Sequence, residues 1–178
     1  MAWPGLALKI LIAVIGGEKI FKEAKKWFME KVQPIEGSIV CCGLLGGACD
    51  HSGVYVGNGD IVHRSGGGYL EVVSPEAFLA RHSGRNPAWR IHVSCRGESA
   101  VGNDKARNRA LQAVNNHNHS EYSGYHLQKK NCHHFCQYCL TGIKSEEQGP
   151  MYFTFTSLEQ TLKDECQFDK WRVWDVHK

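Results

Sequence analysis

The sequence predicts an α+β domain in which a small antiparallel sheet packs against helices. From Gly37 onward, the chain contains short runs of β-branched and aromatic residues separated by turn residues. Two of these runs flank Asn58-Gly59, a dipeptide typical of β-hairpin turns. Several helical patterns carry their own capping residues, among them the pattern from Cys132 to Leu140. Strands and helices of this kind together indicate a mixed fold.

Residues 1–34 differ from the rest and predict an N-terminal helical segment. The run from Leu6 to Ile15 is apolar except for one lysine, but it is shorter than the ~20 residues that span a bilayer. Residues 18–31 place aromatic and lysine side chains at helical spacing, which predicts an amphipathic helix with a cationic face. Such a helix is suited to an anionic membrane surface, and the alternative is packing on its own domain or on another copy. We place the domain boundary between residues 34 and 35.

The elements of the second domain, residues 35–178, follow from spacing and capping residues. Ser74 is the expected N-cap of a short helix, and Asp104 is the expected cap of a longer one. Asn131 is expected to cap the helix that begins at Cys132, and Gly142 is expected to end it. The predicted elements are, in order, strand 38–42, hairpin 53–64, strand 69–73, helix 74–82, strand 88–94, and helices 104–116, 132–140 and 157–165 before a final strand 171–176.

Composition narrows the class of function. The chain has 178 residues, of which 42% are hydrophobic, so it can bury a core without covalent staples. The net charge of +3 is too small to indicate a nucleic-acid partner. Eight cysteines, two of them adjacent at positions 41 and 42, together with an opening that lacks a basic n-region, predict a reduced, cytoplasmic chain. The N-terminal amphipathic helix adds the expectation of peripheral membrane association. No oligomeric state is predicted.

The segment "NCHHFCQYC", residues 131–139, raises three alternatives: a metal site, a redox pair or a nucleophile. Cys136-x-x-Cys139 with Cys132 or His133 offers half of a zinc site, but a structural zinc needs four ligands, and the other cysteine cluster is irregularly spaced. A redox pair is disfavoured because Cys136 and Cys139 lie late in the helix. We therefore predict no metal and no cofactor, and we expect Cys136 and Cys139 to be core residues.

Cys132 is the candidate nucleophile because it falls in the first turn of its helix. Unpaired backbone N–H groups and the helix dipole at that end favour a thiolate. A thiolate nucleophile also needs a base to handle its proton and a third group to orient that base.

The hairpin offers both groups as His51 and His63, provided that they share a face of the sheet. A two-residue Asn58-Gly59 turn alone would pair His63 with Val54 and separate the two histidines. A three-residue loop with left-handed Gly59 would instead pair His63 with Gly53 and bring the histidines within reach of one another. We predict the second register.

The motifs "DHSGVYVGNGDIVHRSG" and, far downstream, "NCHHFCQYCLTG" resemble the lecithin:retinol acyltransferase family of the permuted papain-like superfamily. The resemblance covers roughly residues 35–142. It implies a permuted papain-like fold, with the small sheet packed against the nucleophile helix. It further implies that Cys132 is the nucleophile, His51 the general base and His63 the residue that orients the base. Two positions depart from the family: Ser52 stands where an aromatic residue is common, and His133 where an acidic residue is common.

The resemblance implies a thiol acyltransferase or phospholipase A-type hydrolase that acts on phospholipid esters through a thioester. The second enzyme hypothesis is a cysteine peptidase or amidase of the same superfamily. The non-enzyme hypothesis is a membrane-tethered or zinc-stabilised binding module. Loss of activity in Cys132→Ser with intact folding would exclude the binding module, and a phospholipid acyltransferase should take an acyl chain from phospholipid onto Cys132 during turnover.

Overall fold

The structure is a computed structural model, and it describes residues 31–43, 51–80, 90–116, 131–144 and 155–176. The chain divides into two compact units, Met1–Lys31 and Val32–Lys178. The predicted amphipathic helix, residues 18–31, falls almost wholly outside the described residues. The second unit carries the elements described below.

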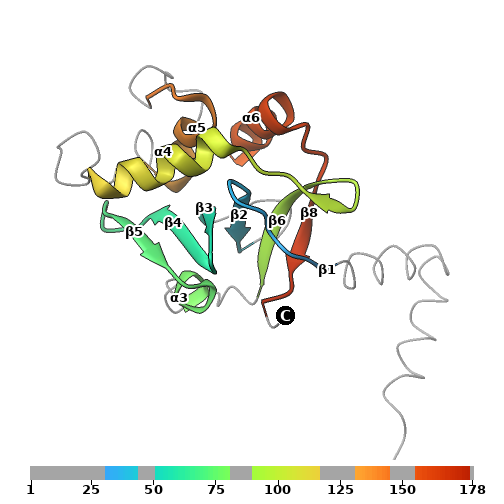
Figure 1. Cartoon of the computed structure of the whole chain (residues 1–178), viewed down its shortest axis with the longest axis horizontal. Helices are drawn as coiled ribbons and strands as arrows, with labels where there is room; N and C mark the ends of the chain where they lie inside the picture. Colours follow the sequence, from blue (N-terminus) through green and yellow to red (C-terminus); the bar gives the residue numbers. More distant parts are fainter. Residues whose placement is uncertain (1–30, 44–50, 81–89, 117–130, 145–154, 177–178) are drawn as a thin grey trace, which may run out of the picture. The chain divides into compact units, whose positions relative to one another are not determined.

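Eight strands among the described residues form one sheet in the order β1-β8-β6-β2-β3-β4-β5, and β7 pairs with β6 (Figure 1). Six described strand pairs are antiparallel: β2 with β3, β2 with β6, β3 with β4, β4 with β5, β6 with β7, and β6 with β8. The strands are β1 Lys31–Val32, β2 Ile39–Cys42, β3 His51–Gly57, β4 Asp60–Arg64, β5 Leu70–Val73, β6 Ile91–Arg96, β7 Ser99–Ala100 and β8 Lys170–Trp174.

Helices cover both faces of the sheet. In Figure 1, α4, α5 and α6 lie along one face, and the short α3 lies on the other beside β4 and β5. The α+β class is confirmed, with a sheet larger than the small one expected. The helices in the described part of the chain are α3 Pro75–Ala80, α4 Asp104–Asn115, α5 Cys132–Thr141 and α6 Phe155–Cys166.

Each element predicted from residue 38 onward is present, with small shifts at the ends that the structure describes. Residues 81–82 of the predicted helix 74–82 and residues 88–89 of the predicted strand 88–94 lie outside the described residues. The two-residue strands β1 and β7 were not predicted, because two residues show no periodicity. The cap assigned to Asp104 is wrong: Asn103 caps α4, and its Oδ1 accepts hydrogen bonds from the backbone N–H groups of Lys105 and Ala106 at 2.9 and 3.2 Å. Asn103 has the extended backbone that a cap requires, whereas Asp104 is already helical.

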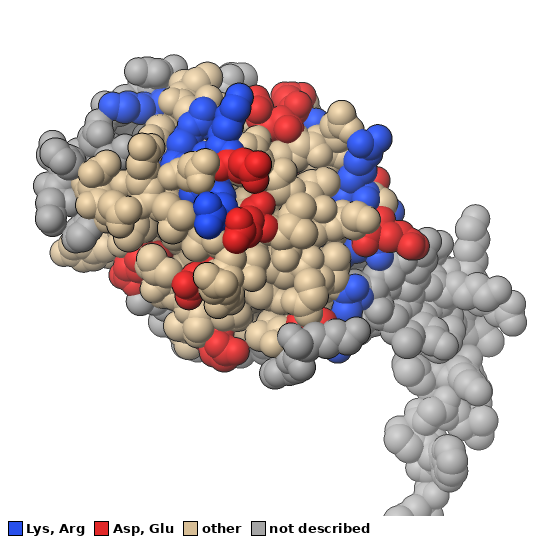
Figure 2. Space-filling view, viewed as in Figure 1, with Lys and Arg blue, Asp and Glu red and all other residues tan. Residues whose placement is uncertain are grey.

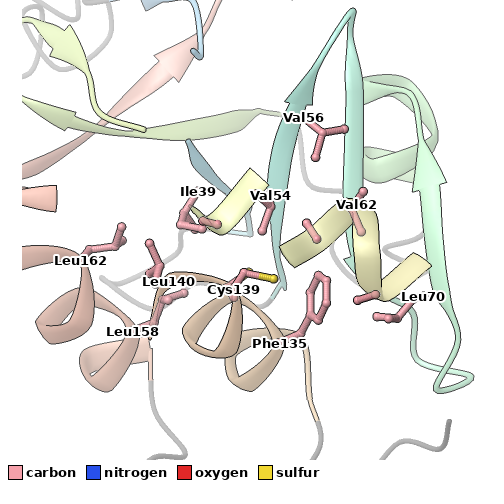
Figure 3. Close-up of a cluster of buried hydrophobic side chains, with 14 of the residues drawn as sticks. Ile39, Val54, Val56, Val62, Leu70, Phe135, Cys139, Leu140, Leu158 and Leu162 are labelled. Atoms are coloured by element: carbon pink, nitrogen blue, oxygen red, sulfur yellow. The ribbon is translucent and has the colours of Figure 1, made fainter. Parts of the chain in front are cut away.

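The main core lies between the sheet and the three helices on one face. Figure 3 shows Phe135 and Cys139 of α5 on the side of Val54 of β3 and Val62 of β4, with Leu140 farther along the helix in the same cluster. All five side chains are buried, so α5 is held against the hairpin by apolar contact. A second cluster, on the other face, includes the α3 residue Phe78.

The surface drawn in Figure 2 carries acidic and basic side chains close together over much of the described part. Single-sign fields are what attract nucleic acid over long distances. The mixed pattern on this face therefore adds no argument for such a partner.

The buried His92 of β6 generates a prediction about pH. Its pKa is lowered from 6.5 to about 4, first by burial and then by the positive charge of Arg90. Between these values the unfolded chain binds a proton that the folded chain excludes, so the free energy of unfolding should fall as pH falls from about 6.5 to 4. We expect a contribution of roughly 3 kcal/mol at most.

The measurement is urea unfolding of wild type and His92→Asn near neutral pH and near pH 4. The variant should lose less stability on acidification than wild type does. Because all other titrating groups are common to both chains, an equal loss would contradict the assignment.

Candidate active site

The hairpin of β3 and β4 holds both predicted histidines on one face. His63 lies opposite Gly53, and Val54 lies opposite Val62, as predicted. The left-handed conformation of Gly59 is confirmed, with a φ of 84°. The three-residue loop was wrong, because the turn has two residues, Asn58 and Gly59, and Asn58 also has a positive φ of 55°. The register instead shifts inside β3, between Tyr55 and Gly57. This bulge supplies the extra residue that the sequence prediction had placed in the loop.

The physical reason for the bulge is the apolar face. A two-residue turn without it would place His63 opposite Val54, which belongs to the buried core beneath α5. With the bulge, Val54 and Val62 enter that core together, and the two histidines face the α3 side of the sheet.

His51 and His63 interact directly. His51 Nε2 lies 2.7 Å from His63 Nδ1, and the two rings are nearly perpendicular, at 88°. Phe78 of α3 contacts both rings, at centroid distances of 4.9 Å to His51 and 5.5 Å to His63. His63 is fully buried and His51 is partly exposed. This arrangement fixes the ring of His51 from one side and leaves it partly accessible.

Cys132 is the first residue of α5, as predicted. Asn131 is extended and caps the helix, since its Oδ1 accepts the backbone N–H of His134 at 3.0 Å. The same oxygen lies 2.9 Å from His134 Nδ1, and because an amide oxygen only accepts, this nitrogen carries the proton. Gly142, with φ of 81°, ends the helix. Cys132 therefore occupies the end of α5 at which the helix dipole favours negative charge.

The start of α5 lies beside the end of the hairpin that carries His51 and His63. The evidence comes from the residues that directly follow Cys132 and the two histidines in the chain. Ser52, which follows His51, lies with its Oγ 2.9 Å from Nδ1 of His133, which follows Cys132. Arg64, which follows His63, is close enough for its charge to interact with a thiolate at Cys132. The structure thus joins His51 to His63 by a hydrogen bond and positions Cys132 beside the same hairpin end. A contact between Cys132 and His51 remains a prediction.

Other thiols are poorly suited to act as nucleophiles. Burial raises the pKa of Cys139 well above its usual value, and the charges of Arg109 and Arg64 only partly offset this effect. Burial likewise raises the pKa of Cys95 and of Cys166 to about 11. Cys136 and Cys139 are fully buried in the main core, as expected.

Two features of the site were missed in the sequence. Arg64 is buried near the predicted nucleophile, and burial lowers its pKa more than the charges of Cys139 and Cys132 raise it. Its position directly after His63 was the available signal. The hydrogen bond of Ser52 with His133 was also missed, although both positions stand out as departures from the resembled family.

Within the described ranges, no group of three or more His, Cys, Asp or Glu side chains is arranged to hold a metal ion. The same part of the chain contains no helix long and apolar enough to cross a membrane. Comparisons of the chain with family models, with curated proteins and with solved structures found no match.

The close approach at Gly53 gives a prediction for this site. A Cβ at position 53 would lie 2.7 Å from Ile61 Cγ2, 3.0 Å from the Val62 carbonyl oxygen and 3.2 Å from His63 Cβ. We expect Gly53→Ala to cost about 1–3 kcal/mol of stability through overpacking and to displace His63. Urea unfolding and the ¹⁵N spectra of the histidine rings measure the two effects.

Gly59→Ala is the matched control. Nothing lies within 4 Å of its added Cβ, so this change strains only the turn, through a φ of 84°. It should cost about 1–2 kcal/mol and leave the ring signals of His51 and His63 unchanged. Equal perturbation of the rings by both substitutions would argue against a local role of Gly53.

Proposed function

We propose that this chain is a cysteine-dependent acyltransferase or acyl hydrolase that acts on phospholipid esters through a thioester, with a permuted papain-like fold related to the lecithin:retinol acyltransferase family. Cys132 is the nucleophile, His51 the general base and His63 the group that orients His51. The reaction needs no metal or cofactor, because the three side chains supply the nucleophile and the proton transfers.

The observation that carries the proposal is the 2.7 Å contact between His51 Nε2 and His63 Nδ1, at the hairpin end beside the start of α5. A base held by a second polar side chain is the arrangement that an activated thiol requires. The helix start at Cys132 and the nearby charge of Arg64 both favour the thiolate.

The contact between the rings assigns roles to the nitrogens of His51. When His51 Nε2–H donates to His63 Nδ1, the Nδ1 of His51 is left to take the proton of Cys132. After this transfer both nitrogens of His51 carry protons, and the bond to His63 persists and stabilises the imidazolium. His63 therefore orients the base in both of its protonation states.

The chemical steps follow from these roles. The Cys132 thiolate attacks the ester carbonyl, and backbone N–H groups at the start of α5 stabilise the oxyanion. The tetrahedral intermediate expels the alcohol, which takes the proton from His51 Nδ1. Water, an amine or another alcohol then gives up a proton to His51, attacks the thioester and releases the thiol. The acceptor determines whether the outcome is hydrolysis or transfer.

The decisive prediction is a covalent adduct. Incubation with mixed phospholipids should add the mass of one acyl chain to the intact protein, and hydroxylamine should remove it, since it cleaves thioesters. Cys132→Ala should abolish the adduct. His51→Ala should slow its formation by about 10²–10⁴-fold, because the thiol loses its base and the alcohol its acid. His63→Gln should slow it less, because His51 remains present but is oriented less well.

Cys139→Ala is the control, because that thiol is buried and its pKa is raised. It should retain the adduct, although the cavity will cost stability. An adduct that persists on Cys132→Ala, or that disappears from well-folded Cys139→Ala, would contradict the assignment. Adduct formation with peptide or amide substrates, and none with lipid, would favour the peptidase alternative.

A membrane role for the N-terminal segment is part of the proposal. Phospholipid esters lie at the bilayer interface, and residues 18–31 have the lysine-rich amphipathic pattern that binds there. The full chain should co-sediment with anionic vesicles, less so at high salt because exposed charges are screened. Changing Lys19, Lys22, Lys25 and Lys26 together to Gln should weaken binding. Unchanged binding would point instead to a packing or oligomer contact.

A further inference from the structure

The hydrogen bond between Ser52 and His133 connects the two halves of the proposed site. Ser52 Oγ lies 2.9 Å from His133 Nδ1, and both side chains are buried. Ser52 belongs to β3 and directly follows His51, whereas His133 belongs to α5 and directly follows Cys132. We propose that Ser52 and His133 are positioning residues, whose bond sets the separation of Cys132 from His51. This inference rests on the proposed function.

Cys136, Ser52 and His133 form a chain of hydrogen bonds in which each donor has an acceptor. Cys136 Sγ donates to Ser52 Oγ at 3.4 Å, which leaves the hydroxyl proton of Ser52 for His133 Nδ1. His133 then carries its own proton on Nε2. On the α6 side, the His133 ring lies 6.1 Å from the ring of Phe155, which stacks on Trp171 at 5.5 Å. His133 is thus supported by an aromatic pair while it bonds to the strand.

Chain geometry explains why this bond controls the proposed site. Adjacent Cα atoms are about 3.8 Å apart, so restraining Ser52 against His133 also restrains the residues that precede them. Successive side chains of a strand point to opposite faces, so Ser52 can meet α5 while His51 meets His63 on the other side. The bond is therefore a directional link between the helix that carries the thiol and the strand that carries the base.

Other contacts of α5 constrain this separation less. The cap bonds between Asn131 and His134 join residues within the start of the helix. Phe135 and Leu140 pack against the sheet through apolar surfaces, which tolerate small sliding movements better than a hydrogen bond does. Reacting groups must be held to within about 0.5 Å of their productive geometry. Loss of the Ser52 hydroxyl should therefore affect reactivity more than folding.

The experiment compares Ser52→Ala with Ser157→Ala in the full chain. Ser157 of α6 accepts a hydrogen bond from Gln137 of α5. Ser157→Ala therefore also deletes a serine hydroxyl that bonds to α5, but this hydroxyl belongs to α6 and not to β3. The first readout is the rate of Cys132 alkylation by iodoacetamide between about pH 5 and 9, followed by peptide mass spectrometry, because the thiolate is the reacting form. The second is kcat and KM for phospholipid.

Ser52→Ala should move the pH profile of Cys132 towards that of an ordinary thiol, because the thiolate loses its alignment with His51 while Arg64 is untouched. We expect kcat to fall by about 10- to 100-fold with KM unchanged, the range typical of small misplacements. Ser157→Ala should leave both readouts unchanged. Matching profiles for the two variants would overturn the inference.

A second pair of variants covers a folding failure of Ser52→Ala. His133→Asn keeps a hydrogen-bonding group at the position of Nδ1 and should retain most of the alkylation rate, whereas His133→Phe keeps the ring and should not. Equal rates for these two would also overturn the inference.

A wild-type chain that forms no acyl adduct and whose Cys132 has an ordinary thiol profile would overturn the proposed function as well. A wild-type adduct with no effect of Ser52→Ala would overturn the positioning role alone.

Discussion

The antiparallel register of β3 and β4 is the constraint on which the site depends. Val54 and Val62 lie opposite one another and enter the core under α5, so Gly53 must lie opposite His63. His51 is then diagonal to His63 on the other face, where their rings meet. The bulge in β3 reconciles this pairing with a two-residue turn. A slip of one residue would bury His63 among the valines and separate it from His51.

Polar contacts lie at both ends of α5: at its start they include the bond between Ser52 and His133, and near its end Arg109 donates to the carbonyl oxygens of Cys139 and Leu140. Ser52, His63 and His134 are all buried near the start, and each takes part in a hydrogen bond. Burying such groups is costly unless they are bonded, so each bond both offsets a cost and restricts geometry. The apolar packing of Phe135 and Leu140 holds α5 on the sheet, while the polar contacts determine its position there.

Two thiols of α5, Cys139 and Cys132, have different electrostatic surroundings. Cys139 lies in the core, where burial outweighs the charges of Arg109 and Arg64 and keeps the thiol protonated. Cys132 lies at the N-terminal end, where the helix dipole and the charge of Arg64 act in favour of the thiolate. Burial, and to a smaller extent the same charge, lowers the pKa of His134, which favours the neutral ring that bonds to the cap. The two sulfurs are both buried, but their positions within α5 place them in different electrostatic surroundings.

The sequence alone determined the longer elements of the second unit, because periodicity, capping residues and turn dipeptides act over a few neighbouring residues. The shared face of the two histidines was predicted by requiring that they cooperate, since the Asn58-Gly59 turn alone would have separated them. Even so, the sequence led us to misplace one cap at Asp104 and to assign the extra hairpin residue to the loop. Tertiary structure decided that this residue forms a bulge in β3, because only the buried pair Val54 and Val62 selects it. It also decided that Ser52 meets His133 and that Arg64 lies near Cys132. These contacts join residues more than sixty positions apart, and such pairings depend on how α5 packs on the sheet, which no local pattern encodes.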